Sequence, residues 1–191
     1  CLPKDRLLPA AASYLEIEEG LADEILYEMI QDLTLELDLI NGREFIFTPK
    51  MHQCEIYIAA RMLMMLNFPA QSITGVEDAI AAVEEQSGMR YARQQKLAIS
   101  QALSKGMLIL TGGPGTGKTT TLNGILNILE QNGERVYLAA PTGRAAQRMS
   151  EVTKREAKTI HRLLEVEWDP QDRPVFTRNE KNMLDCDTLI L

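Results

Sequence analysis

The stretch Gly112-Gly113-Pro114-Gly115-Thr116-Gly117-Lys118-Thr119 decides the fold of this chain. It fits the pattern G-x-x-x-x-G-K-[ST], in which a glycine-rich turn joins a buried strand to a helix. An apolar run at 107–110 precedes it, and a helical pattern at 118–131 follows it. A second apolar run at 136–140 predicts the next strand, since strands that alternate with helices form parallel sheets. The sequence therefore predicts an α/β fold with a phosphate-binding loop.

The residue types of this loop suit the binding of a nucleoside triphosphate. Glycines let the backbone curl around an anion with its N–H groups inward, and the following helix adds positive charge at its N-terminus. Lys118 can reach the β- and γ-phosphates, and the hydroxyl of Thr119 can coordinate Mg²⁺. A chance match is expected in only about 0.3% of such chains, which disfavours an ordinary glycine turn.

We expect Lys118 and Thr119 to be the catalytic groups, with ATP and Mg²⁺ as cofactors. The loop residues expected to bind the nucleotide are Gly112, Gly113, Pro114, Gly115, Thr116, Gly117, Lys118, Thr119 and Thr120.

The first 68 residues are predicted to form a separate module. Apolar residues at helical spacing predict a helix at 21–33, and alternating residues on both sides of Asn41-Gly42 predict a β-hairpin. A further helix is expected at 50–66, with the run 62–66 filling a core. Helix, hairpin and helix together suggest a small α+β, winged-helix-like module.

The chain is expected to have three parts: the module at 1–68, a linker helix within 69–90, and the α/β region at 91–191. The helix of the linker is predicted at 76–85, and Phe68-Pro69 marks the break before it. The α/β region should also contain helices at 145–149 and 160–165, a loop or second hairpin at 168–182, and a buried strand at 188–191.

Composition and charge restrict the function classes. Hydrophobic residues make up 45% and charged residues 25%, as in folded globular proteins, and neither a membrane span nor a signal peptide is indicated. The three scattered cysteines fit neither a disulfide framework nor a zinc site, so a reducing cytoplasm is expected. Up to Gly88 the chain has 5 basic and 16 acidic residues. After Gly88 it has 15 basic and 11 acidic residues. Nucleic-acid binding is therefore expected only in the second half, and a protein partner suits the acidic module.

Three further segments accompany the loop: Arg93-Gln94-Gln95-Lys96-Leu97-Ala98-Ile99, Ala140-Pro141-Thr142-Gly143-Arg144-Ala145-Ala146-Gln147-Arg148-Met149, and Ala157-Lys158-Thr159-Ile160-His161-Arg162-Leu163-Leu164. Together they resemble the first motor domain of superfamily 1 helicases, most closely the RecD/TraA branch of ATP-dependent DNA helicases. The resemblance covers about 91–191. The acidic module is similar to the region that precedes the motor in RecD-like bacterial helicases.

This resemblance implies a RecA-like parallel sheet and ATP-driven movement on single-stranded DNA, with duplex unwinding in the 5′ to 3′ direction. It implies that Gln95 holds the adenine edge, with Gln94 the weaker candidate. Tyr91 either stacks on the base or packs against the sheet. The expected contacts to single-stranded DNA are Pro141, Thr142, Gly143, Arg144, Thr159, His161 and Arg162.

The alternative for the DNA-contact segments is purely structural. Thr142 and Thr159 would then cap helices, and His161 would pack in a core. Lys154, Arg155, Lys158 and Arg162 add positive charge that supports a phosphate-tracking groove.

In the resembling helicases the strand matching Leu189-Ile190-Leu191 leads into an Asp-Glu pair that binds Mg²⁺ and positions the attacking water. A second RecA-like domain supplies an arginine. We expect this chain to be an internal fragment that ends before both and is inactive alone. A P-loop phosphotransferase or NTPase of another class and a partner-binding fragment stay open as alternatives. The sequence does not distinguish whether the complete enzyme works in DNA repair, recombination or conjugation.

Overall fold

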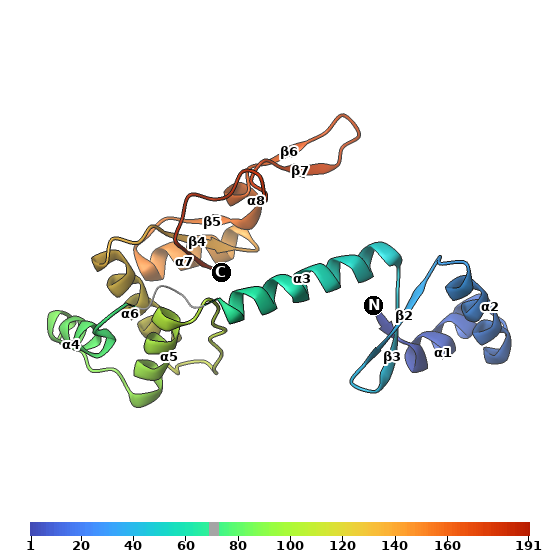
Figure 1. Cartoon of the computed structure of the whole chain (residues 1–191), viewed down its shortest axis with the longest axis horizontal. Coiled ribbons are helices and arrows are strands. Elements are labelled where there is room, and N and C mark those ends of the chain that lie inside the picture. Colours follow the sequence, from blue (N-terminus) through green and yellow to red (C-terminus); the bar gives the residue numbers. More distant parts are fainter. Residues whose placement is uncertain (69–72) are drawn as a thin grey trace. The chain divides into compact units, whose positions relative to one another are not determined.

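The computed structural model describes residues 1–68 and 73–191, and the chain divides into two units, Cys1–Asn67 and Phe68–Leu191 (Figure 1). The start of the expected linker, with Pro69, lies outside the described residues. Within the described ranges, no helix is long and apolar enough to cross a membrane.

The first unit is a small α+β module. Its elements are β1 (Leu2–Pro3), α1 (Lys4–Leu15), α2 (Glu19–Gln31), β2 (Glu36–Ile40), β3 (Arg43–Phe47) and α3 (Pro49–Asn67). The three strands form an antiparallel sheet in the order β1-β3-β2. Asn41 and Gly42 have φ angles of 52° and 78°, so the pair makes the positive-φ turn expected of this dipeptide. The predicted hairpin is confirmed.

Helix α3 is attached to the hairpin through His52 in its first turn. The His52 imidazole contacts the carboxylate of Glu36 through Nδ1, and its Nε2 lies 3.1 Å from Oδ2 of Asp38. Its ring also packs on Phe47, with the centroids 4.9 Å apart. The hydrogen bonds to Asp38 and Glu36 raise the pKa of His52. The histidine therefore ties the start of α3 to β2 and β3.

The prediction that residues 62–66 fill a core is wrong. No residue of α3 is buried, and Leu63 is 59% exposed. The small core of this unit instead comes from α1, α2 and β3, through Ala12, Ala22, Leu26, Ile46 and Phe47. Because α1 packs on both α2 and β3, these elements bury one another without α3.

The second unit is an α/β domain. Its elements are α4 (Val76–Ser87), α5 (Arg93–Ser104), α6 (Lys118–Gln131), β4 (Val136–Ala140), α7 (Gly143–Thr153), β5 (Ala157–Thr159), α8 (Ile160–Leu163), β6 (Val166–Trp168), β7 (Pro174–Phe176) and β8 (Thr188–Ile190). A parallel sheet has the order β5-β4-β8. The fold is a P-loop, RecA-like α/β fold, as predicted.

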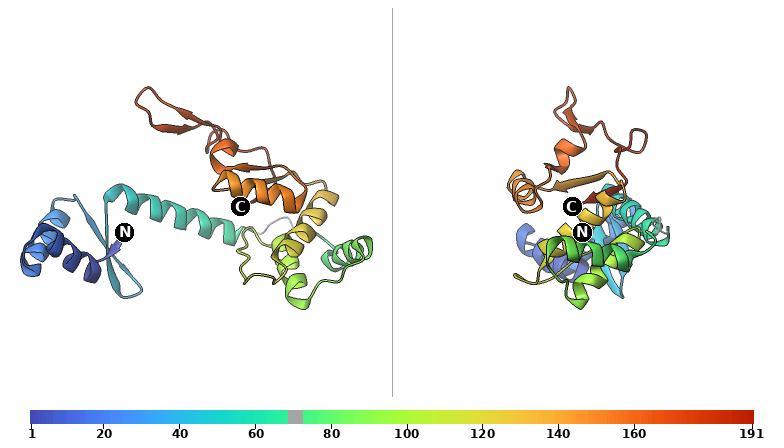
Figure 2. Two further views of the ribbon diagram at one scale, coloured as in Figure 1. Left: turned by 180° about the vertical axis from the view of Figure 1, so that it is seen from behind. Right: turned by 90° about the vertical axis from the view of Figure 1, so that its left-hand side faces the viewer.

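Strands β6 and β7 form the second hairpin, which was one of two options for 168–182. Both views in Figure 2 show it extending from the end of α8 away from the parallel sheet. Trp168 and Val175 on this hairpin are exposed.

Two strand predictions need correction. Residues 107–110 form no strand, and Ile109 is 70% exposed. The parallel sheet has the order β5-β4-β8, and no strand among the described residues pairs with 107–110. An apolar run becomes a strand only when a neighbour satisfies its backbone groups. The last strand, β8, forms as expected but is not buried, since Leu189 is exposed.

The main core of the second unit lies between α4, α5 and α6. Its buried members are Ile80, Val83, Tyr91, Ile99, Leu103, Ile125, Ile128 and Leu129. The helix expected to act as a linker, α4, thus contributes Ile80 and Val83 to the packing around the loop helix α6.

Candidate nucleotide and DNA site

The phosphate loop has a backbone that only glycine adopts without strain. Gly115 and Gly117 have φ angles of 73° and 80°, in the left-handed region. A Cβ on Gly112 would lie 2.8 Å from Oγ1 of Thr116, whose hydroxyl donates to the carbonyl of Gly113 at 2.9 Å. A side chain has no room at Gly112, whereas at Gly115 there is open space and it is the positive φ angle that favours glycine.

Lys118 turns back over the loop that precedes it. Its ammonium donates to the carbonyl oxygens of Gly112 and Gly113, both at 2.6 Å. Gly117 caps α6 without a side-chain hydrogen bond, and Thr119 is exposed at the first turn of that helix. A cation, free helix N–H groups and an exposed hydroxyl are thus gathered at one end of α6. This donor set fits a magnesium-bound phosphate chain.

Gln95 contacts the same loop from α5. Its Oε1 accepts from the N–H of Ala92 at 2.8 Å, and its Nε2 donates to the carbonyl of Gly117 at 3.4 Å. A Cβ on Gly117 would lie 2.3 Å from this Nε2. The amide therefore caps the start of α5 and lies against the loop. Gln94 is exposed. The contact between Gln95 and adenine stays a prediction.

Tyr91 belongs to the core and not to an open base-binding surface. It is 7% exposed, and its ring packs against Gly124 of α6. Burial, with a smaller contribution from the Glu84 charge, raises the pKa of the Tyr91 phenol. Glu84 accepts from Lys96 at 2.7 Å and from the backbone N–H of Tyr91 at 2.6 Å, and both bonds lower the pKa of its carboxyl. The structure supports packing for Tyr91, but against helix α6, whereas the sequence suggested packing against the sheet.

The two segments expected to contact DNA leave the sheet side by side. Strands β4 and β5 are parallel neighbours, and Ala140 pairs with Thr159 in their register. The chain therefore enters 141–144 and 160–162 from the same edge of the sheet. This is the carboxyl edge, where open α/β sheets place their ligands.

Both threonines of these segments cap helices. The Oγ1 of Thr142 accepts from the N–H of Ala145 at 3.3 Å, and that of Thr159 accepts from the N–H of Arg162 at 3.2 Å. A hydroxyl that accepts in this way still has its own proton to donate. Capping and a phosphate contact are therefore compatible, and the DNA contacts stay predictions.

His161 is not a packed core residue. It is exposed on α8, and its ring lies 6.1 Å from that of Phe176 on β7. The pair joins the expected DNA segment to the base of the projecting hairpin.

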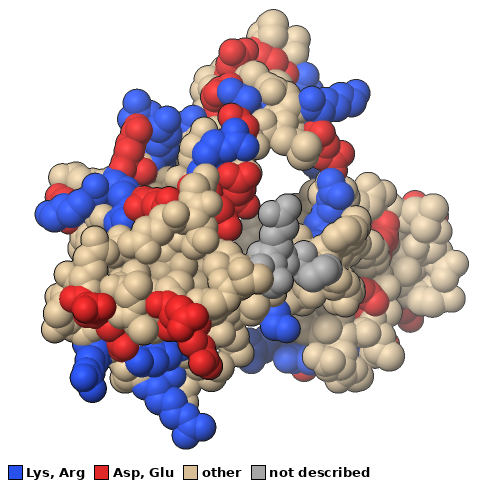
Figure 3. All heavy atoms as spheres, turned by 60° about the vertical axis from the view of Figure 1, so that its left-hand side comes forward, with Lys and Arg blue, Asp and Glu red and all other residues tan. Residues whose placement is uncertain are grey.

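The basic residues of this unit fall into two groups. Those in ion pairs are Lys96 with Glu84, Arg135 with Asp185 and Asp187, Arg155 with Glu130, Lys158 with Glu156, Arg173 with Asp169, and Arg178 with Glu165. The exposed Arg144, Arg148, Lys154 and Arg162 make no side-chain hydrogen bond or ion pair within 1–68 and 73–191. Figure 3 shows blue and red side chains interspersed on the visible face, without one large basic patch.

This division corrects one expectation. Arg155 was expected to add free positive charge to a DNA groove, but its guanidinium is held by Glu130 and Asn127. Lys158 is 3.7 Å from the carboxylate of Glu156. Of the four unpaired cations, Arg144 and Arg162 are the two that lie in the expected DNA-contact segments.

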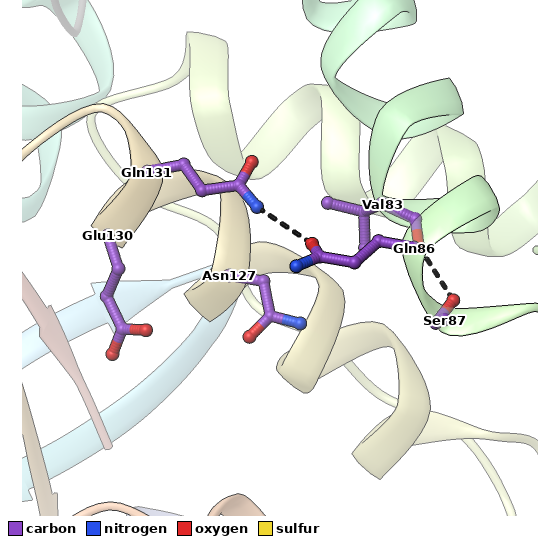
Figure 4. Close-up of a pocket in the computed structure, with 6 residues that line it drawn as sticks. All are labelled: Val83, Gln86, Ser87, Asn127, Glu130 and Gln131. Atoms are coloured by element: carbon purple, nitrogen blue, oxygen red, sulfur yellow. Dashed lines mark hydrogen bonds between the residues drawn. The ribbon is translucent and has the colours of Figure 1, made fainter.

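A cavity of about 450 Å³ lies between α4 and α6, at the end of α6 opposite the phosphate loop (Figure 4). Its lining residues are Val83, Gln86, Ser87, Asn127, Glu130 and Gln131, and Gln131 donates to Gln86 at 3.2 Å. None of the predicted site residues lines it. No group of three or more His, Cys, Asp or Glu residues suited to a metal occurs in the part of the chain that the structure describes.

The loop, the helix that it opens and the parallel sheet define a P-loop nucleotide-binding domain. A family model described as "AAA domain" matches residues 95–191. The chain belongs to this family, and its relatives place it among the RecD-like helicases of superfamily 1. One of these relatives is named as an ATP-dependent DNA helicase.

Two relatives illustrate the similarity. The ATP-dependent RecD2 DNA helicase of Deinococcus radiodurans is 36% identical over 124 residues, which cover 65% of this chain and 17% of the relative. The RecBCD enzyme subunit RecD of Mycolicibacterium smegmatis is 36% identical over 121 residues, which cover 51% of this chain and 22% of the relative. The chain thus spans 17% to 22% of the length of these two relatives.

Proposed function

We propose that this chain is part of an ATP-dependent DNA helicase that moves along single-stranded DNA and unwinds duplexes in the 5′ to 3′ direction. The observation that carries the proposal is the pairing of two features in one unit: a P-loop with Lys118 folded over it, and two adjacent strand ends that present unpaired arginines.

The nucleotide half of the proposal rests on residues 112–120. Lys118 would exchange its two carbonyl partners for phosphate oxygens, since an ammonium is a stronger partner for an anion than for a carbonyl. Thr119 would hold Mg²⁺, which neutralises charge on the transferred phosphoryl group. Gln95 would contact the adenine edge while supporting Gly117.

The DNA half rests on residues 141–144 and 159–162. Phosphate oxygens can accept hydrogen bonds from the backbone amides, from the hydroxyl protons and from the free guanidinium groups of Arg144 and Arg162. None of these donors distinguishes one base from another. The track should therefore hold the backbone of single-stranded DNA without reading its sequence.

A protein-contact role is proposed for the first unit. The exposed apolar side chains of α3, among them Ile56, Leu63 and Leu66, offer a surface that this unit leaves uncovered. Two relatives are named as subunits of the RecBCD enzyme, which supports a protein partner for the protein as a whole.

The proposal is tested with the chain itself by measuring nucleotide and DNA binding separately. A fluorescent ATP analogue with Mg²⁺ should bind the wild type but not Lys118→Ala.

Labelled oligo-dT, followed by anisotropy over a salt series, should bind with an affinity that falls as salt rises. Each lost arginine contact should reduce the slope of log K against log salt by about 0.7. Arg144→Ala with Arg162→Ala should show this, whereas Arg135→Ala should not, because Arg135 is already paired with Asp185 and Asp187. Equal slopes in all three proteins would contradict the DNA track.

A further inference from the structure

One face of the loop helix α6 carries a row of polar side chains. Asn123, Asn127 and Glu130 are spaced by four and three residues, so they lie along the same side of the helix. Figure 4 shows Asn127 and Glu130 directed to one side of α6, whereas Gln131 points to Gln86 of α4. A row of this kind on a helix whose middle is largely buried needs partners from another element.

All three side chains are hydrogen-bonded to the end of α7 or to the turn between α7 and β5. Asn123 Nδ2 donates to the carbonyl of Val152 at 3.1 Å. The Nη2 of Arg155 donates to Asn127 Oδ1 and to Glu130 Oε2, both at 2.6 Å. The same guanidinium donates through Nη1 to the carbonyl of Thr153 at 2.7 Å. We call these contacts the Arg155 latch.

The turn held by the latch is itself stiffly bonded. The buried Thr153 donates to the carbonyl of Met149 at 2.7 Å, and the N–H of Lys154 bonds to Ser150. The N–H of Ala157, the first residue of β5, donates to Ser150 Oγ at 2.9 Å. A shift of Arg155 would therefore move the end of α7 and the start of β5 together.

Each element joined by the latch has its other end at one of the two proposed sites. Helix α6 begins at Lys118, directly after the phosphate loop. Helix α7 begins at Gly143 within one DNA-contact segment, and β5 ends at Thr159 in the other. A rigid link between these three elements connects the loop to both DNA segments.

We propose that Arg155 is a positioning residue that couples nucleotide binding at the phosphate loop to DNA binding at 141–144 and 159–162. The inference rests on the proposed function, since it assumes that both ligands bind. The geometry requires arginine: a planar guanidinium bonds to a carboxylate, an amide and a backbone carbonyl at once, and a lysine ammonium does not have that reach. The partly exposed ion pair between Arg155 and Glu130 would by itself add little stability. We therefore assign the several hydrogen bonds of Arg155 to the alignment of α6 with the turn between α7 and β5.

The test is thermodynamic linkage. Affinity for labelled oligo-dT is measured with and without a non-hydrolysable ATP analogue and Mg²⁺, and the ratio of the two affinities is the coupling. Wild type should give a ratio that departs from one by about fivefold or more. Arg155→Ala should bring the ratio to within about twofold of one, while each ligand alone binds with near-normal affinity. Arg155→Lys and Asn123→Ala should give intermediate ratios.

Arg173→Ala is the matched control, because it removes an arginine–carboxylate pair of 2.8 Å in the same unit but outside the latch. Its ratio should equal that of wild type. A wild-type ratio in Arg155→Ala, with only a lower unfolding midpoint, would overturn the proposal. Should Arg155→Ala fail to fold, wild-type ratios in both Arg155→Lys and Asn123→Ala would overturn it.

The wild type separates this inference from the proposed function. Binding of both ligands with a ratio of one would overturn the coupling and leave the proposed function standing. Absence of DNA binding in wild type would contradict the proposed function itself, and the inference would fall with it.

Discussion

Tyr91 and Gly124 fit so closely that a Cβ on residue 124 would lie 2.6 Å from the hydroxyl oxygen of Tyr91 and 2.9 Å from its Cζ. The contact joins the segment before α5 to the middle of the loop helix α6. It requires glycine at a helix-interior position, where glycine costs about 1 kcal/mol relative to alanine. Close packing is therefore favoured here over helix propensity.

Gly124→Ala should destabilise the second unit by about 1–2 kcal/mol, because overpacking exceeds the gain in helix propensity. Urea unfolding measures the change. Gly20→Ala in α2 is the control, since nothing lies within 4 Å of a Cβ there, and it should not destabilise. Adding Tyr91→Phe to Gly124→Ala should recover part of the loss. No loss in the single variant would show that the ring moves aside without cost.

Gln95→Ala should weaken ATP binding and lower the preference for ATP over GTP. Loss of its hydrogen bond to Gly117 should reduce affinity for both nucleotides, by roughly fivefold for a bond of about 1 kcal/mol. Loss of the adenine contact should add a further reduction for ATP alone. Competition against a fluorescent analogue gives both affinities, with the exposed Gln94→Ala as control. An unchanged ATP to GTP ratio would remove Gln95 from the base site.

Thr159→Ala should lower both stability and single-strand affinity, because its hydroxyl caps α8 and is proposed to donate to DNA. The loss of stability should be about 0.5–1 kcal/mol, at the lower end for caps since α8 is one turn. Thr159→Ser keeps the hydroxyl and should preserve both properties. A loss of stability with unchanged DNA affinity would leave Thr159 as a cap only.

His161→Ala should weaken single-strand binding without a measurable change in stability. The side chain is exposed, and the ring contact with Phe176 is its only interaction besides backbone bonds in the described part of the chain. Anisotropy and urea unfolding on the same preparation separate the two effects. The opposite result, lower stability with normal affinity, would assign His161 to packing against the hairpin.

Stability of the first unit should depend on pH through His52. The charged groups facing its ring are Glu36 and Asp38 of β2, and hydrogen bonds to both raise its pKa above the ordinary value of 6.5. A raised folded-state pKa gives stability that is fully present below about 6.5 and is lost as pH rises through the folded value. The difference in unfolding midpoint between wild type and His52→Ala should therefore shrink from pH 6 to pH 9. A difference independent of pH would exclude a charged His52.

Much of the fold follows from local patterns. The sequence predicts the turn at Asn41-Gly42 and the ends of α6 and β4 to within a residue or two. The signals used were the conformational freedom of glycine, the spacing of apolar residues and helix-capping residues, and each depends only on a few neighbouring residues. The P-loop fold was predicted for the same reason, since the residues of the loop are contiguous, and nucleotide binding by these residues stays a prediction. The family followed from the loop together with three further motifs at fixed spacing.

Other features depend on partners far along the chain. The sequence predicts a strand at 107–110, yet a strand needs a hydrogen-bonded neighbour, and this segment pairs with no strand of the described sheet. The apolar run 62–66 reads as core, yet α1, α2 and β3 bury one another without it.

The sequence by itself determined that this chain holds a phosphate loop at 112–119 in an α/β domain, because glycine conformation and side-chain chemistry are local properties. Only the tertiary structure decided which charges are free. The sequence gives no reason to treat the arginines at 155 and 162 differently. Packing brings Glu130 and Asn127 to Arg155, whereas Arg162 is left exposed. The physical reason is that an ion pair is set by distance in space, and residues 130 and 155 meet only when α6 packs against the α7–β5 turn.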